Sequence, residues 1–205
     1  MGLTTRAEPP VVPLAGPLTA RCVILVPVYN EDPVTTFSRI AAMDESLAAT
    51  GQAHLFHFAI LSDTRNEAIA ARERLWFLRL LKDRAAEGRM FYRRRADNKG
   101  KKAGNVEDFI MKSGGAYDLA LILDADSVMG AASVQLMADR MAVEPGLGLI
   151  QTVPRVLGGH TLWQRMQSFA TEVYGTNLGR GFATWTGAEG NFLGHNALVR
   201  TRALA

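Results

Sequence analysis

Short apolar runs alternate along the chain with segments in which apolar residues recur every three or four positions. The runs are rich in β-branched and aromatic residues and end at polar or turn-forming residues, which is typical of buried strands. Six of them predict strands: CVILVPVY (22–29), LFHFAILSD (55–63), RMFYRR (89–94), YDLALILD (117–124), GLGLIQTV (146–153) and NALVR (196–200).

The segments between these runs have the spacing of helices with one buried face. Helices are predicted at residues 33–50, 67–86, 105–113, 131–143 and 162–175. The helix over 67–86 would bury the apolar side chains of Ile69, Leu75, Trp76, Leu78 and Leu81. Asn105 is a residue type that commonly caps a helix, so the next helix is predicted to begin there.

Strands that alternate with helices predict an α/β domain with a mostly parallel central sheet flanked by helices and joined by right-handed crossovers. Ligands of such sheets bind beyond the carboxyl ends of the strands. Three predicted strands end in polar residues there, in VPVYNED, ILSD and LILDAD. Residues 1–20 contain four prolines and are predicted to be a flexible leader, so the domain would span residues 21–205.

Composition narrows the class of protein. A chain of 205 residues that is 48% hydrophobic and 21% charged fits one globular domain and excludes a disordered chain. Cys22 is the only cysteine, so no internal disulfide can form and a reducing compartment is expected. No run approaches the roughly 20 apolar residues of a membrane span, and no signal peptide is visible. We therefore expect this stretch of chain to be soluble.

The net charge of +3 hides a local basic cluster, YRRRADNKGKK, in residues 92–102. Such a cluster is either a solvated loop or the place where an anionic partner binds. A nucleic acid is disfavoured as that partner, because Phe91 and Tyr92 fall in a predicted strand and do not interleave with bases.

Asp124 and Asp126 follow the strand LALIL with one alanine between them. Side chains two positions apart on an extended chain point the same way, and two neighbouring carboxylates repel unless a positive charge joins them. A divalent cation, Mg²⁺ or Mn²⁺, bound by both carboxylates and by substrate phosphates would remove that repulsion. The alternative is a solvated turn that ends at Ser127.

Asp63 ends another predicted strand, where it is either a site residue or the cap of the helix that follows. The segment KKAGN supplies what a metal and phosphate site still lacks. Lys102 offers a point charge, Gly104 permits close approach of the backbone, and the helix beginning near Asn105 offers amide donors. Neither a Walker loop nor the G-x-G-x-x-G fingerprint of dinucleotide binding is present.

Taken together and in this order, VPVYNED, ILSD, KKAGN and LDADS resemble the family 2 glycosyltransferases. These are inverting enzymes with the GT-A nucleotide-diphospho-sugar transferase fold. The resemblance implies that Asp63 contacts the nucleobase and that Asp124 and Asp126 hold the metal. It also implies a set of donor-binding residues: Pro27, Tyr29, Glu31, Asp63, Lys102, Asn105 and Asp124.

A closer resemblance rests on YNEDP, ILSD, FYRRR, LDADSVM, FATEVYG and GHNALVR. These segments look like the cytoplasmic catalytic domain of the glucans biosynthesis glucosyltransferase H family. The resemblance implies transfer of glucose from UDP-glucose to a growing β-glucan, the backbone of osmoregulated periplasmic glucans. Cellulose synthase domains share the scaffold, so a cellulose-synthase-like glucan synthase is the nearest alternative. They read G-S-N where this chain reads GHN, which favours the periplasmic-glucan branch.

Members of that family place the general base beyond GHNALVR, so the resemblance implies that the base lies beyond Ala205. Glu189, in the glycine-rich loop WTGAEGNFLG, is a weak candidate for the role. The family also implies flanking transmembrane helices and a location at the cytoplasmic face of the bacterial inner membrane. We therefore expect a piece that binds donor without completing transfer. The rival hypothesis from another class is a nucleotide-sugar sensor module.

Overall fold

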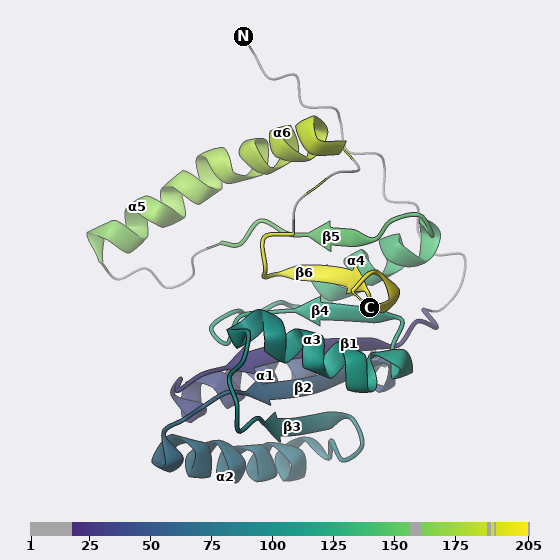
Figure 1. The fold of residues 1–205 in the computed structure, drawn as a ribbon. Helices are drawn as coiled ribbons and strands as arrows, with labels where there is room; N and C mark the ends of the chain where they lie inside the picture. The colour runs from purple at the N-terminus through teal and green to yellow at the C-terminus, as the bar shows by residue number, and fades with distance from the viewer. Residues whose placement is uncertain (1–17, 156–160, 188–189, 191, 205) are drawn as a thin grey trace.

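The protein is a six-stranded sheet with helices on both faces (Figure 1). The computed structural model describes residues 18–155, 161–187, 190 and 192–204. The strands follow one another in the sheet in the order β3-β2-β1-β4-β6-β5. Their bounds are β1 Cys22–Val28, β2 Phe56–Ser62, β3 Met90–Arg94, β4 Leu119–Ile122, β5 Leu149–Gln151 and β6 Ala197–Arg200. The predicted α/β class and mostly parallel sheet are confirmed.

One strand of the described sheet, β6, runs against the others. β1 pairs in parallel with β2 and β4, and β2 pairs in parallel with β3, whereas β6 is antiparallel to both β4 and β5. Ala197, the first residue of β6, therefore pairs with Ile122, the last residue of β4. The residues that precede β6 consequently lie at the carboxyl end of β4.

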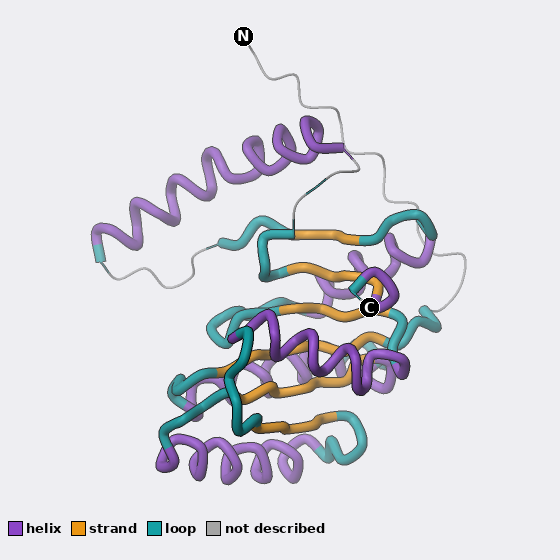
Figure 2. Tube along the Cα trace, in the orientation of Figure 1, coloured by secondary structure: helices purple, strands orange, loops and turns teal. Residues whose placement is uncertain are grey.

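Four of the described helices cover the two faces of the sheet, α1, α2 and α4 on one and α3 on the other, whereas α5 and α6 lie beyond its edge, as the purple tubes of Figure 2 show. Their bounds are α1 Pro33–Ala48, α2 Glu67–Arg84, α3 Lys101–Ser113, α4 Ala131–Val143, α5 Leu162–Ala170 and α6 Thr176–Thr186. Helices α1, α2 and α4 contribute to one core cluster, and α3 contributes to the other. A π-helical turn, Thr171–Gly175, joins α5 to α6.

The core forms because β1 is apolar on both of its sides. Cys22, Ile24 and Val26 face the cluster under α1 and α4, whereas Val23 and Leu25 face α3. All seven residues of β1 are buried, which is typical of a central parallel strand. Leu18, with 5% exposure, already belongs to the first cluster, so the folded part begins before the predicted boundary at residue 21.

Local capping fixes the loops at the carboxyl ends of β1 and β2. Asp32 caps α1 by accepting from the backbone N–H of Thr35 at 3.0 Å. Asn66 caps α2 by accepting from the N–H groups of Ala68 and Ile69. The alternative interpretation of Asp63 as the cap of α2 is therefore wrong.

The buried face of α2 differs from the prediction. Trp76 and Leu81 pack against the core as predicted, but Leu75 and Leu78 are 66% and 62% exposed. The buried residues of the helix are Ala70, Glu73 and Leu80. The helix is rotated so that Glu73 meets hydroxyl groups of β2 and β3. Periodicity alone misses this orientation, because it assigns apolar residues to the core and carboxylates to solvent.

Helix α3 begins four residues earlier than predicted. Gly100 adopts a left-handed conformation with φ of 70° and precedes the first helical residue, Lys101. Asn105 thus lies within the helix, and the prediction that it caps α3 is wrong. The glycine-bearing segment, which was expected to lead into the helix, is its first turn.

The helix predicted at 162–175 continues through the π turn to Thr186 and lies beyond the edge strand β5 (Figure 1). It approaches the chain after β5 closely, since a Cβ atom added to Gly179 would meet a methyl group of Val153 at 2.7 Å. Most of its large apolar side chains are exposed, among them Leu162, Trp163, Phe169, Leu178 and Trp185. Within the described residues, no helix is long and apolar enough to cross a bilayer.

Candidate functional site

The predicted site residues gather at the carboxyl edge of the sheet, in the loops that follow β1, β2 and β4 and at the start of α3. Parallel strands bring these loops together because they all end at the same edge. The reversed strand β6 adds the residues that precede it, including His195.

Asp124 is the centre of the group of residues beyond β4. One of its carboxylate oxygens contacts the Nζ atom of Lys102, and the other lies 3.9 Å from Nδ1 of His195. The three side chains are 40%, 37% and 35% exposed, respectively, so all of them are accessible to a ligand. Lys102 sits in the first turn of α3, where the helix dipole also favours negative charge. The Asp124 carboxylate thus lies between Lys102 and His195, with Lys102 as its cationic partner.

Asp126 lies in a turn and not on an extended segment. The N–H of Ser127 donates to the carbonyl of Asp124 at 3.0 Å, which closes the turn over Ala125 and Asp126. The prediction that an extended chain aligns both carboxylates is therefore wrong, although both side chains remain accessible.

Among the described residues, no group of three histidine, cysteine, aspartate or glutamate side chains is placed to hold a metal. Magnesium commonly uses one or two carboxylates and takes its other ligands from phosphates and water. Asp124 and Asp126 fit that limited set of protein ligands.

Asp63 is buried and paired, in contrast to Asp124. Its two carboxylate oxygens accept from Nε and Nη2 of Arg95 at 2.7 and 2.8 Å. Only 6% of Asp63 is exposed, and the bond it makes raises the pKa of the Arg95 guanidinium above its usual range. A bidentate pair of this kind is rigid. Any contact of Asp63 with a ligand therefore involves the pair rather than a free carboxylate.

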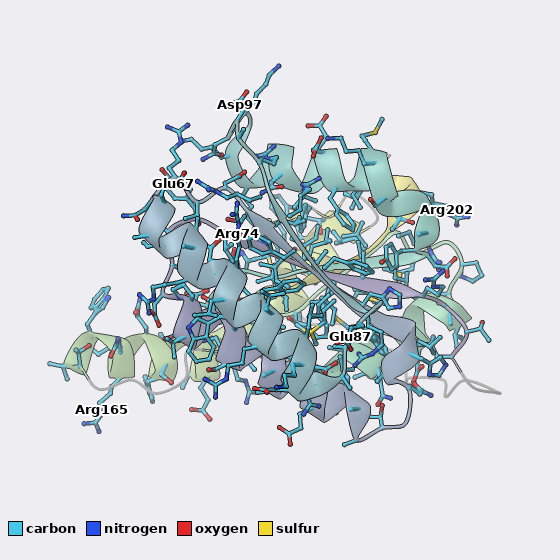
Figure 3. All side chains as sticks on the ribbon, turned by 90° about the horizontal axis from the view of Figure 1, so that it is seen from below. Glu67, Arg74, Glu87, Asp97, Arg165 and Arg202 are labelled. Carbon is cyan, nitrogen blue, oxygen red and sulfur yellow. The ribbon has the colours of Figure 1, made fainter. Side chains whose placement is uncertain are left out.

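A cavity of about 470 Å³ opens between the loops after β2 and β3. Glu67 and Arg74 bound it on the α2 side, and both are labelled in Figure 3. Its other lining residues are Asp63, Thr64, Arg65, Arg94, Arg95, Ala96 and Asn98. Two of its four arginines, Arg94 and Arg95, pair with its two carboxylates, so the positive charge of the lining that lies outside these pairs comes from Arg65 and Arg74.

The loop after β1 is held against the loop after β2. The N–H of Asn30 donates to Oγ1 of Thr64 at 2.9 Å, and the Asn30 side chain accepts from the N–H of Asn66 at 3.1 Å. Asn30 has a positive φ of 60°, which turns the chain sharply after the strand. The two loops therefore form one unit.

Three residues of the predicted donor site lie in β1 or in the loop that follows it. Pro27 is buried within β1, whereas Tyr29 is 47% exposed and Glu31 is exposed. A carboxylate oxygen of Glu31 contacts the backbone nitrogen of Tyr29. Tyr29 thus presents an accessible ring beside the carboxyl end of β1, whereas Pro27 contributes only to the shape of the strand.

The arginines of the basic cluster are paired within the protein. Arg93 bonds to Asp108 at 2.5 Å, Arg94 to Glu67 at 2.7 Å and Arg95 to Asp63 at 2.7 Å. The interpretation of the cluster as a solvated loop is therefore wrong for these arginines. An anion would meet mainly the lysines.

Asn105 has an internal role. It is fully buried, donates to the carbonyl of Leu61 at 3.0 Å and accepts from Arg93. These bonds fasten α3 to β2 and β3. The structure offers Asn105 no surface on which to touch a ligand. Glu189, the weak candidate for a base, lies outside the described residues.

Sequence reasoning missed His195 and Glu73 as residues of this region. His195 comes near Asp124 only because β6 is antiparallel, and no local pattern indicates that reversal. Glu73 sits at a helical position where a carboxylate is normally solvated. The sequence feature that goes with its burial is a set of three hydroxyl-bearing residues near the ends of two strands, Ser62, Thr64 and Tyr92, which donate to it.

Comparison with curated proteins gives close relatives. The chain is 58% identical over 206 aligned residues to a glucans biosynthesis glucosyltransferase H of Cereibacter sphaeroides, covering all of this chain and 35% of the relative. It is 47% identical to the protein of the same name from Xylella fastidiosa, covering 96% of this chain and 31% of the relative. The chain thus spans about a third of the length of these relatives. No family model matches it.

Solved structures show the same fold at low sequence identity. Residues 1–349 of TarS from S. aureus superpose with a TM-score of 0.52 and 11% identity, over 90% of this chain and 48% of that one. Mannosyl-3-phosphoglycerate synthase from Rubrobacter xylanophilus superposes with a TM-score of 0.50 and 12% identity, over 90% of this chain and 55% of that one. These are GT-A glycosyltransferases, and the described part of this chain has the GT-A fold.

Proposed function

This chain belongs to the glucans biosynthesis glucosyltransferase H family and matches about a third of the length of those proteins, and we propose that it is their donor-binding part. The donor would be UDP-glucose. The observation that carries the proposal is the placement of Lys102, Asp124 and His195 around one accessible point at the carboxyl edge of the sheet.

The nucleotide would lie across the joined loops after β1 and β2. Tyr29 would pack near the base or ribose, and the Asp63–Arg95 pair would border the nucleobase. The diphosphate would reach Lys102 and the first turn of α3, because both favour negative charge. Each part of the donor thus has a matching chemical environment.

Asp124 and Asp126 would hold Mg²⁺ or Mn²⁺. When bound, the cation would neutralise charge on the departing nucleotide. Lys102 adds a second positive charge on the same side and contacts Asp124, so it keeps that carboxylate oriented. The acceptor hydroxyl of a β-glucan would form the new bond at the anomeric carbon with inversion, while the bond to UDP breaks.

The family resemblance also supports a setting for the longer protein. We place it in the bacterial inner membrane as a polytopic enzyme, with this domain on the cytoplasmic side and the acceptor glucan extending from it.

Calorimetric titration with UDP-glucose, UDP and uridine, each with Mg²⁺ and with EDTA, tests the proposal. Lys102→Ala should weaken UDP by roughly 10- to 100-fold, as expected for loss of a charged hydrogen bond, and should leave uridine unchanged. Asp126→Ala should abolish the effect of Mg²⁺. Lys99→Ala is the matched control, because Lys99 is an exposed lysine just before α3.

Two results would overturn the proposal. One is the absence of UDP binding by the unaltered chain, and the other is binding that EDTA leaves unchanged. Equal losses for UDP and uridine in Lys102→Ala would assign Lys102 to folding and not to the diphosphate.

A further inference from the structure

A carboxylate on α2 is buried without a cationic partner among the described contacts. Glu73 is 2% exposed, and hydroxyl groups surround its carboxylate. One oxygen accepts from Ser62 at 2.7 Å and from Tyr92 at 2.8 Å, and the other accepts from Thr64 at 2.5 Å. Burying a charge is costly unless hydrogen bonds compensate it, so this arrangement needs an explanation.

The Thr64 hydroxyl is the link between Glu73 and the loops of the site. A hydroxyl has a single proton, and here that proton is donated to Glu73. The lone pairs of Oγ1 then face the N–H of Asn30, from which Thr64 accepts at 2.9 Å. Glu73 thereby decides which way the Thr64 hydroxyl points, and the hydroxyl in turn holds the loop after β1.

The backbone of Thr64 is held as firmly as its side chain. Its N–H donates to Oγ of Ser62 at 3.2 Å, and its carbonyl accepts from Nε of Arg94 at 2.8 Å. Thr64 is 1% exposed and directly follows Asp63. A shift of Thr64 would therefore move Asp63 on one side and Asn30, with its neighbour Tyr29, on the other.

We propose that Glu73 and Thr64 are positioning residues that lock the loops after β1 and β2 into one nucleoside-binding surface. The proposal deepens the function proposed above and rests on it. Neither residue touches the ligand. They act through Asn30 and Asp63, so their effect falls on the nucleoside end and not on the diphosphate end at Lys102.

Tyr92 provides the contrast that separates positioning from general stability. It donates to the same carboxylate from β3 but has no bond to the loop after β1. Burial raises the pKa of Tyr92 to about 12, so its hydroxyl keeps its proton for Glu73. Removing this hydroxyl takes one bond from Glu73 and leaves the Thr64–Asn30 contact in place.

The test compares Thr64→Val, Thr64→Ser and Tyr92→Phe in three measurements: melting temperature, affinity for UDP and for uridine, and hydrogen exchange of the Asn30 amide. Thr64→Val should lower the affinity for UDP and for uridine by about tenfold or more, and it should speed hydrogen exchange of the Asn30 amide. Thr64→Ser keeps the hydroxyl and should stay within about threefold of the unaltered chain. Tyr92→Phe should lower the melting temperature while changing affinity less than about twofold.

A loss of affinity that merely follows melting temperature across the three variants would overturn the proposal. Unchanged affinity and unchanged exchange at Asn30 in Thr64→Val would overturn it too. If Thr64→Val does not fold, Glu73→Gln takes its place, because one amide oxygen cannot accept from all three hydroxyls. Exchange at Asn30 needs no ligand. A chain that binds no UDP but shows the expected exchange would refute the proposed function and leave the loop lock standing.

Discussion

At the scale of single residues, the same sequence context produced two different environments. Asp63 and Asp124 each follow an apolar strand, yet Asp63 is enclosed by Arg95, whereas Asp124 stays accessible between Lys102 and His195. Substituting Asp63 with alanine would leave the mostly buried guanidinium of Arg95 without its ion-pair partner. A loss of nucleotide binding in that variant would therefore report loop structure together with any direct contact.

His57 yields a prediction about pH at this same scale. It is buried in β2, with Nδ1 3.1 Å from the Tyr117 hydroxyl, and burial, followed by the charges of Arg21 and Arg89, lowers its pKa below the usual 6.5. In the unfolded chain His57 therefore becomes protonated near pH 6.5, whereas in the folded chain it becomes protonated only at lower pH. Stability should be unaffected by this group above that pH and should fall as the pH drops below it, by at most about 1.4 kcal/mol per pH unit.

Urea denaturation at pH 7.5, 6.5 and 5.5 checks this, with His57→Gln as the comparison. As the pH falls, the free energy of unfolding of the unaltered protein should decrease more than that of His57→Gln. A difference that stays constant over this range would contradict the assignment.

At the scale of elements, a buried ion pair network fastens α1 to both ends of the connection between α2 and β3. Asp44 of α1 is 1% exposed and accepts from Arg84 at 2.9 Å and from Arg89 at 2.8 Å. Asp44→Ala should lower the free energy of unfolding by about 3–5 kcal/mol, because it leaves two guanidinium groups without their shared partner.

Asp83→Ala is the matched control for Asp44. Asp83 pairs with Arg79 at 3.4 Å, but both side chains are more than half exposed, so its loss should cost under about 1 kcal/mol. Equal costs for the two variants, measured by urea denaturation, would show that the Asp44 network adds no more than a surface pair.

The elements also show where the sequence is informative. The helix at 131–143 and the strand at 90–94 follow from local pattern, because buried residues recur at helical spacing in the first and Met90 and Tyr92 alternate toward the core in the second. The face of α2 and the start of α3 do not. The first depends on where Glu73 finds hydroxyl donors, and the second on the left-handed backbone of Gly100. For the site, the residues at strand ends are readable from sequence, whereas the burial of Asp63 and Asn105 requires the tertiary structure.

At the scale of the whole molecule, the helix formed by α5, the π turn and α6 contributes no residue to either of the described core clusters. Trp163 and Trp185 on it are 66% and 82% exposed. Exposed apolar groups gathered on one element commonly mark a contact surface. The third tryptophan, Trp76, is half-buried on α2, with the Arg79 guanidinium 5.0 Å from its ring centre.

Fluorescence therefore has a defined expectation. Acrylamide should quench most of the emission of this three-tryptophan protein, and the spectrum should be centred at the wavelength of hydrated indole. Changing both Trp163 and Trp185 to phenylalanine should leave a weaker, blue-shifted emission from Trp76. The acrylamide quenching constant of that emission should be lower by about twofold or more. Emission from the unaltered protein that is largely protected from acrylamide would mean that this helix is covered.

The reversed strand β6 also dictates an order of events during synthesis. β4 and β5 are not neighbours, so β5 can join the sheet only after β6 has been inserted between them. Until residues 197–200 have left the ribosome, β4 is an open edge of the kind that invites pairing with other chains. A nascent chain at this stage can already pair β1, β2 and β3, but His195 is not yet held beside Asp124. The proposed nucleoside end of the surface can thus form early, whereas the proposed diphosphate end is completed only when β6 joins the sheet.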